Sequence, residues 1–321
     1  MTLQTRKPTG KPPWPFLLLA GVQKSGKSWA ASMMSASDLI DRTFWIEVGE
    51  GAADQYGALP GARYEIVEHD GSLRAILGAI HDIKQLPTDG KPHAIVIDSM
   101  TELWDLLVDE QQRKANEKRN RQEAQITLDQ WNVAKKRWKN IIDALRTHNG
   151  PVVVTARLDE VMVMGDDGKP STAREWKVKA EKNLPYEVDG IVEMPKPGVA
   201  ILTGVRSVTV HTPPNGLPLD DFSIDSLWRQ LGLDADGATA PRNYSAPDSS
   251  KASTTDEPWL IATRELIEAE QSKEDMQAVW ERMSEGVANG LVSQVDYDAL
   301  EVMWHAAADK YRNQPAEKDA A

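Results

Sequence analysis

Short apolar runs alternate with longer amphipathic stretches between residues 15 and 233. The apolar runs have the length of strands and fall at 16–20, 43–48, 94–97, 152–155, 190–193, 199–202 and 207–211. Apolar residues at helical spacing lie between the earlier runs, at 28–35, 73–85, 99–116 and 127–146. This alternation predicts an α/β fold with a mostly parallel sheet flanked by helices on both faces, and the closely spaced last runs predict an antiparallel edge.

The composition changes at residue 234. Residues 234–258 are rich in Ala, Ser, Thr, Asp, Gly and Pro, so we expect a disordered linker that follows the core at 15–233. Residues 1–14 and 313–321 are expected to be tails, and 259–312 to form a small helical module. Two apolar stripes at helical spacing support the module, namely Met276, Val279, Trp280 and Met283, and then Leu300, Met303, Trp304 and Ala307.

The sequence of this module also predicts where its helices begin and end. Ser272 with Asp275 and Ser293 with Asp296 have the pattern of N-caps, and glycines at 286 and 290 are expected to separate two helices. The stripes are expected to form the module's own core, with a groove for a protein partner as the alternative.

The bulk composition excludes several classes of protein. The 321 residues include no cysteine, which excludes a disulfide scaffold, a thiol nucleophile and a cysteine-ligated metal. No apolar run approaches the roughly 18 residues of a membrane span, so we expect no membrane partner and a cytoplasmic location. The net charge of −12 argues against a wholly nucleic-acid-binding surface but permits a local basic patch.

One segment matches the P-loop pattern G-x-x-x-x-G-K-[ST] in full. It consists of Gly21, Val22, Gln23, Lys24, Ser25, Gly26, Lys27 and Ser28, and Trp29 follows in the same predicted nucleotide-binding segment. It comes after an apolar strand and opens a helix, as phosphate binding requires. We expect Lys27 to reach the β- and γ-phosphates of ATP and Ser28 to bind Mg²⁺.

A second apolar strand ends in Asp98, which is the Walker B arrangement and predicts a second contact to the Mg²⁺ shell. The next residue is Ser99, so a water-activating base has to come from elsewhere. The strand at 43–48 ends near Glu47 and Glu50, and we favour Glu50 because Glu47 lies within the strand. Both being ordinary loop acids is the alternative.

The run 44–56 (FWIEVGEGAADQY) resembles the catalytic-glutamate segment of RecA-family recombinases, and Asp98-Ser99 resembles their Walker B ending. Over residues 15–233 the chain is most similar to compact phage RecA-like ATPases of the Sak single-strand-annealing group. The resemblance implies ATP-dependent binding and annealing of single-stranded DNA in a bacterial host cytoplasm. It also implies a polar sensor at the end of the strand 152–155, where Arg157 replaces the usual glutamine. Arg157 is expected either to sense phosphate or to pair with a surface acid.

Two segments are candidates for nucleic-acid binding. The first holds five basic residues against one acid, Glu117, and a solvated helix face is its alternative; its members are Arg113, Lys114, Lys118, Arg119 and Arg121. The second, 158–183, contains a predicted hairpin turning at 166–168, and Trp176 as a platform for base stacking or as a packing residue.

Lysines also follow in this segment. RecA-like rings place lysines nearby that reach the neighbouring subunit's ATP, so the resemblance makes Lys177, Lys179 and Lys182 candidates for action in trans. Together these features predict a DNA-stimulated ATPase that forms a homo-oligomeric ring or filament. The alternatives are a hexameric replicative motor or helicase loader, a nucleotide-gated scaffold with negligible turnover, and a small-molecule P-loop kinase, for which no arginine-rich lid is evident.

Overall fold

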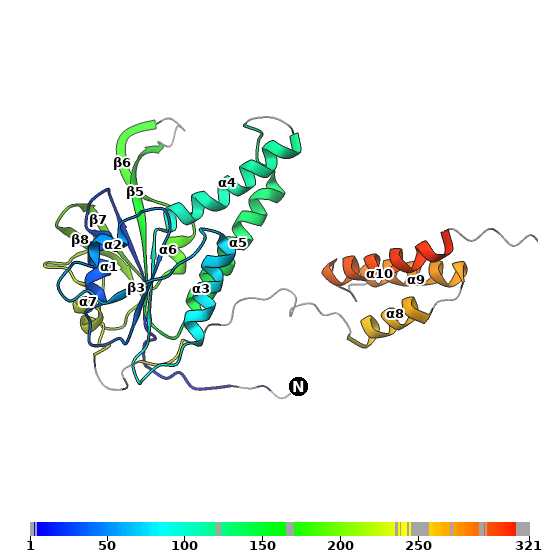
Figure 1. Cartoon of the computed structure of the whole chain (residues 1–321), viewed down its shortest axis with the longest axis horizontal. Helices are drawn as coiled ribbons and strands as arrows, with labels where there is room; N and C mark the ends of the chain where they lie inside the picture. The colour runs from blue at the N-terminus through cyan, green and yellow to red at the C-terminus, as the bar shows by residue number, and fades with distance from the viewer. Residues whose placement is uncertain are drawn as a thin grey trace, which may run out of the picture. The chain divides into compact units, whose positions relative to one another are not determined.

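A computed structural model describes residues 3, 5–119, 123–164, 170–234, 237, 239–242, 244, 257–269, 272–288, 292 and 294–312. The chain divides into two compact units, Met1–Ser245 and Ala246–Ala321 (Figure 1). Each unit is considered by itself below.

The first unit is built on one sheet. Its strands are β1 (Phe16–Gly21), β2 (Thr43–Glu47), β3 (Tyr64–Ile66), β4 (Ala94–Asp98), β5 (Val152–Met164), β6 (Pro170–Lys179), β7 (Gly190–Lys196), β8 (Val199–Val205) and β9 (Leu217–Pro218). Their order is β3-β2-β4-β5-β1-β7-β8-β9, and β6 pairs with β5. Strands β3 to β7 along this order run parallel, whereas β8, β9 and β6 pair antiparallel to their neighbours.

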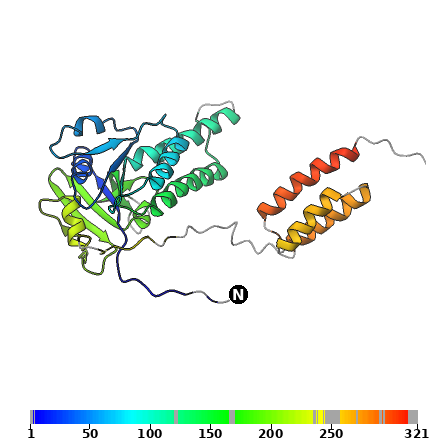
Figure 2. The same ribbon diagram turned by 60° about the horizontal axis from the view of Figure 1, so that its bottom comes forward.

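Helices cover both faces of this sheet. Every residue of β1 is therefore buried. Phe16 and Leu18 contact the layer that holds α3 (Leu73–Gln85), α4 (Met100–Arg119) and α5 (Leu128–Arg146). Leu17 and Leu19 contact the opposite layer, which holds α1 (Lys27–Met34) and α7 (Ile224–Gln230). Figures 1 and 2 show the two layers on either side of the strands. Short helices α2 (Ala53–Tyr56) and α6 (Leu184–Glu187) lie in connections.

The fold class expected from the sequence is therefore confirmed: an α/β core with a mostly parallel sheet flanked by helices, an antiparallel edge and separate C-terminal helices. One expected strand, 207–211, is wrong. There the Ser207 hydroxyl accepts hydrogen bonds from the amides of Thr209 and Val210 and forms a local turn, and Val208 is 87% exposed. A side chain that binds nearby amides competes with strand pairing, and β9 supplies the edge strand instead, with Leu217 opposite Leu202.

Two pairs of elements project from the upper end of the first unit in Figure 1. One is the hairpin of β5 and β6, whose predicted turn at 166–168 lies outside the described residues. The other is the pair α4 and α5, joined near its base by contacts of Trp104 with Trp131 and Trp138. Helix α4 begins directly after β4, and β5, which pairs with β4, continues into the hairpin, so both projections start at the same edge of the sheet.

Part of the stretch expected to be a linker contacts the core. The Arg242 guanidinium forms an ion pair with Asp189 at 2.9 Å, and the Tyr244 hydroxyl donates to Asp143 at 2.6 Å. The amide of Ala240 also donates to the carbonyl of Pro12 at 3.0 Å. Contacts of the first unit thus extend to residue 244, whereas the domain limits at 233 and 258 stay predictions.

The second unit contains α8 (Glu257–Ala269), α9 (Lys273–Ala288) and α10 (Gln294–Arg312) around a core that includes Val279, Met283 and Leu300. The expected cap is present at Ser272, whose hydroxyl accepts from the Asp275 amide at 3.1 Å, while Ser293 lies outside the described residues. The expectation that Gly286 separates two helices is wrong. It lies inside α9, where a side chain is excluded because the Trp259 ring would be 2.5 Å from its Cβ.

Candidate nucleotide site

The P-loop connects β1 to α1 in a conformation that depends on its glycines. A Cβ on Gly21 would lie 2.4 Å from the Ser25 hydroxyl, so this position excludes a side chain. Gly26 has φ of 101° and Lys24 has φ of 60°, which place both in the left-handed region. The turn directs the chain into α1 at Lys27, and this strand–loop–helix geometry is that of a phosphate-binding loop.

The Lys27 ammonium donates to the carbonyls of Gly21 and Val22, both at 3.0 Å. Burial lowers the pKa of Lys27, and the nearby carboxylates of Asp98 and Glu50 oppose this effect. The cation is thus held over the loop by neutral carbonyls, which a phosphate can replace as its partner.

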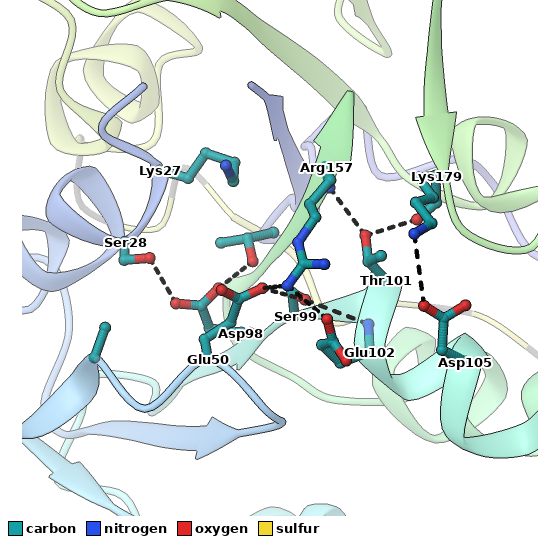
Figure 3. A network of polar contacts seen from close by, with 12 residues as sticks. Lys27, Ser28, Glu50, Asp98, Ser99, Thr101, Glu102, Asp105, Arg157 and Lys179 are labelled. Carbon is teal, nitrogen blue, oxygen red and sulfur yellow. Dashed lines mark hydrogen bonds and ion pairs between the residues drawn. The ribbon is translucent and has the colours of Figure 1, made fainter. Parts of the chain in front are cut away.

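Asp98 lies at the end of β4 and is 1% exposed. Its carboxylate accepts from the Ser28 hydroxyl at 2.7 Å and from the Thr155 hydroxyl (Figure 3). Burial raises the pKa of Asp98, and the two hydroxyl hydrogen bonds act in the opposite direction. A carboxylate beside a serine hydroxyl is an oxygen pair that suits Mg²⁺, so the residues present fit the predicted metal at Ser28 and Asp98.

The two candidate bases have different surroundings. Glu47 accepts hydrogen bonds from the amides of Ala52 and Ala53, at 2.6 and 3.2 Å, and so satisfies the first amides of α2. Glu50 lies beyond the strand, where Oε1 accepts from the Ser99 hydroxyl at 3.1 Å. Glu50 is therefore the carboxylate joined to the residue after Asp98, and Glu47 has a structural role in the loop. This geometry supports the choice of Glu50.

Arg157 lies in β5, two residues after Thr155, and stands opposite Gly21 in the register of β5 and β1. Its guanidinium pairs with Glu50 at 3.0 Å and with Glu102 at 2.5 Å (Figure 3). The Arg157 side chain is 40% exposed, so its guanidinium can exchange these carboxylates for another anion. Of the two roles expected for Arg157, pairing with an acid is present twice, and phosphate sensing stays a prediction.

Other members of the P-loop segment have local roles. Ser25 is buried within the loop, and the amide of Val22 donates to the carbonyl of Met194 at 3.2 Å. Gln23 is exposed. Trp29 is 52% exposed and meets Tyr56 edge to face, with 6.3 Å between the ring centroids. Its predicted nucleotide contact stays a prediction.

The predicted nucleic-acid residues lie on the two projecting pairs of elements. On α4, Arg113, Lys114 and Lys118 are exposed, and Lys114 pairs with Glu110 at 2.6 Å. Arg119 ends α4, and Arg121 lies outside the described residues. The basic segment thus occupies the outer half of the helix.

On the hairpin, the candidates divide between opposite faces. Trp176 stands opposite Glu160 and is 41% exposed, whereas Lys177 and Lys179 point to the other face because side chains alternate along a strand. Lys177 pairs with Glu175 at 2.7 Å and Lys179 with Asp105 at 3.8 Å. Lys182 is exposed in the turn before α6. The stacking platform and the lysines therefore face different surroundings.

Four polar side chains at this site were not predicted from the sequence. They are Ser99, which binds Glu50, and Thr155, Thr101 and Glu102. Thr155 was detectable as the polar end of an otherwise apolar run beside the Walker B strand. Thr101 is fully buried and joins the hairpin to α4, and Glu102 binds Arg157; neither function has a local sequence pattern.

The same core is similar to known proteins. The sequence profile of the AAA domain family matches residues 15–215. Curated proteins gave no match. Among solved structures, the RadB recombinase is similar with a TM-score of 0.37 and 20% identity, over 61% of this chain and 84% of that one. In the part of the chain that the structure describes, no helix is long and apolar enough to cross a membrane. Since the profile match spans more than half of the sequence and contains both Walker motifs, the chain belongs to the AAA domain family and is an ATPase.

Proposed function

We propose that this chain is a Mg²⁺-dependent ATPase that binds single-stranded DNA, assembles as a homo-oligomer and acts in recombination by strand annealing. The observation that carries the proposal is the contact of the candidate base with the projecting hairpin. Glu50 pairs with Arg157 at 3.0 Å, and Arg157 belongs to the long strand β5 that continues into the hairpin. A ligand on the hairpin is therefore connected to Glu50 through strand β5 and one ion pair.

The residues have distinct parts in this function. Lys27 and the P-loop amides bind the β- and γ-phosphates, and Ser28 and Asp98 hold the Mg²⁺, which when bound neutralises phosphate charge. Glu50 orients and deprotonates the attacking water. Arg157 leaves the carboxylates for the γ-phosphate once single-stranded DNA on the hairpin has moved the hairpin base.

The basic outer half of α4 supports nucleic acid as the ligand. Arg113 and Lys118 are exposed on a chain whose net charge is −12, and cations concentrated on one projection attract a polyanion by releasing its counterions. Trp176 on the hairpin offers a ring for stacking, which suits single strands with accessible bases. The resemblance to Sak-type ATPases points to the same ligand and to the cytoplasm of a bacterial host.

Assembly is part of the proposal, because the hairpin lysines lie outside the chain's own P-loop. We expect a lysine of the 177–182 segment to reach the ATP of a neighbouring subunit, where a cation supplied in trans adds about 10³–10⁵ to the rate in other P-loop systems. The test mixes Lys27→Ala protein with a variant that carries alanine at Lys177, Lys179 and Lys182. Mixed assemblies should regain activity. Full turnover by the triple variant alone would exclude action in trans, and a loss limited to DNA affinity would make the lysines DNA contacts.

The deciding experiment measures ATP turnover with and without a single-stranded oligo-dT, together with the mass of the assembly. Stimulation by the oligonucleotide supports a DNA-dependent ATPase, whereas stimulation by a small phosphate acceptor would indicate a kinase. A closed hexamer with unwinding or loading activity would favour the alternative of a replicative motor or helicase loader. Turnover near zero under all conditions would leave a nucleotide-gated scaffold.

The C-terminal unit is expected to bind a protein partner. Ile261, Leu266 and Val302 are exposed by 49, 43 and 70% on a three-helix module that already has its own core. Removing the module should abolish such binding and leave ATP turnover intact.

A further inference from the structure

The base of the hairpin is tied to α4 by one buried hydroxyl. Thr101 is 0% exposed, and its Oγ1 accepts a hydrogen bond from the amide of Arg157 at 2.9 Å and donates one to the carbonyl of Lys179 at 2.6 Å. Arg157 and Lys179 are partners in the antiparallel register of β5 and β6. The hydroxyl therefore bridges two opposed backbone groups, one from each strand, as Figure 3 shows.

The same turn of α4 also contacts the candidate base. Ser99, directly before α4, donates to Glu50, and Glu102 binds the guanidinium of Arg157 at 2.5 Å. Asp105, one turn further along, pairs with Lys179 at 3.8 Å. The start of α4 thus contacts both the hairpin and Arg157, which binds Glu50. Among the described residues of this turn, Thr101 alone is fully buried and bonds to the backbone of both hairpin strands.

We propose that Thr101 is a positioning residue that fixes Arg157 on Glu50 and so restrains hydrolysis until the hairpin base moves. Arg157 donates to Oε1 of Glu50, the same oxygen that accepts from Ser99. A carboxylate oxygen whose lone pairs already accept from a guanidinium and a hydroxyl is not free to accept a hydrogen bond from the attacking water and orient it. The pairing therefore holds the base in a restrained state.

Thr101 controls this state through the backbone. Without its hydroxyl, the amide of Arg157 and the carbonyl of Lys179 lose their connection to α4 and can satisfy one another across the strands, as antiparallel partners do. Arg157 then shifts with the hairpin and away from Glu102 and Glu50. A ligand whose binding moves the hairpin base would break the same two hydrogen bonds of the Thr101 hydroxyl. This inference rests on the proposed role of Glu50 as the base.

The test compares Thr101→Val, which removes the hydroxyl at nearly constant volume, with Thr101→Ser, which keeps it. We expect Thr101→Val to raise basal kcat without DNA by roughly fivefold, the low end of coupling between sites. KM for ATP should stay unchanged because the P-loop is untouched, and Thr101→Ser should restore the wild-type value. Thr203→Val on β8 is the matched control, since its hydroxyl donates to Glu193 at 3.4 Å, away from the site.

Two further variants show whether Thr101 acts through Arg157. Arg157→Gln, at a side chain 40% exposed, should fold and raise basal kcat by a similar factor, and adding Thr101→Val to it should raise kcat no further. A basal kcat that stays unchanged in Arg157→Gln, or a fall in Thr101→Val that persists in the double variant, would overturn the inference. The Arg157→Gln result decides even where Thr101→Val fails to fold.

Failure of the proposed function gives a different result. Full turnover in Glu50→Gln would remove Glu50 as the base and leave the hairpin connection to be judged by hydrogen exchange. Amides at 155–160 and 177–181 should then exchange faster in Thr101→Val and at the wild-type rate in Thr101→Ser and Arg157→Gln. Unchanged exchange in Thr101→Val would overturn the connection itself.

Discussion

The contact of Arg242 with Asp189 predicts how far the core can be shortened. Asp189 is 8% exposed and accepts from the amide of Phe16 at 2.9 Å, from Arg242 at 2.9 Å and from Arg206 at 3.0 Å. The Arg242 side chain is only 9% exposed, whereas that of Arg206 is 66% exposed. Arg242 is therefore the buried positive partner of Asp189, and Arg206 is a partner in contact with water. Residue 242 lies beyond the predicted end of the core at 233.

The perturbation is Arg242→Met, which keeps much of the side-chain volume and removes the charge. Removing one partner of a buried ion pair costs about 3–5 kcal/mol. Asp189 keeps Arg206 and the Phe16 amide, so we expect about 2–4 kcal/mol. For a unit of this size each kcal/mol lowers Tm by about 2–4 °C, which gives a fall of roughly 4–16 °C. Arg206→Met is the matched control and should cost less than about 1 kcal/mol, since its guanidinium is largely in water.

Calorimetry of the full chain measures the change in Tm. The unfolding transition whose Tm rises on addition of ATP is that of the core. Truncation after residue 245 should leave that transition unchanged, whereas truncation after 233 should lower it as much as Arg242→Met or more. Equal, small effects of Arg242→Met and Arg206→Met would refute the reasoning, because the buried pair would then contribute no more than a surface pair.

Three further predictions concern the nucleotide site. Lys27→Ala should lose most ATP affinity with an unchanged circular dichroism spectrum; a folded variant that binds ATP normally would contradict the phosphate role. Glu50→Gln should bind ATP but hydrolyse it about 10²–10⁴-fold more slowly, whereas Glu47→Gln should mainly lower Tm; rapid-quench rates decide, and the reverse pattern would identify Glu47 as the base. Because burial raises the pKa of Asp98, its ionised form is disfavoured without metal and protons compete with Mg²⁺. Mg²⁺ affinity, measured by calorimetric titration, should therefore fall as pH drops from 7 to 5, and Asp98→Asn should bind more weakly with a flatter pH dependence.

Much of the core was predictable because its signals are local. The P-loop is a run of consecutive residues whose glycines and lysine determine one turn, and the expected helix at 73–85 matches α3 in both bounds. The buried strands were visible as apolar runs, since a parallel sheet covered on both faces needs apolar side chains in both directions. The antiparallel edge was predicted correctly, although Ser207 replaced its last expected strand with a turn.

The sequence by itself thus determined the fold class, the phosphate-binding loop and the positions of Asp98 and of two candidate bases. Only the tertiary structure showed that Glu47 and Glu50 have different partners, since Glu47 accepts from backbone amides and Glu50 from the Ser99 hydroxyl. It also decided that Arg157 pairs with Glu50 and that Arg242 pairs with Asp189. These partners are 107 and 53 positions apart (157 − 50 and 242 − 189). The strand order β2-β4-β5 brings the loop that holds Glu50 near Arg157, and contacts of residues 240–244 with the core bring Arg242 to Asp189. The residues adjacent in sequence specify neither pairing.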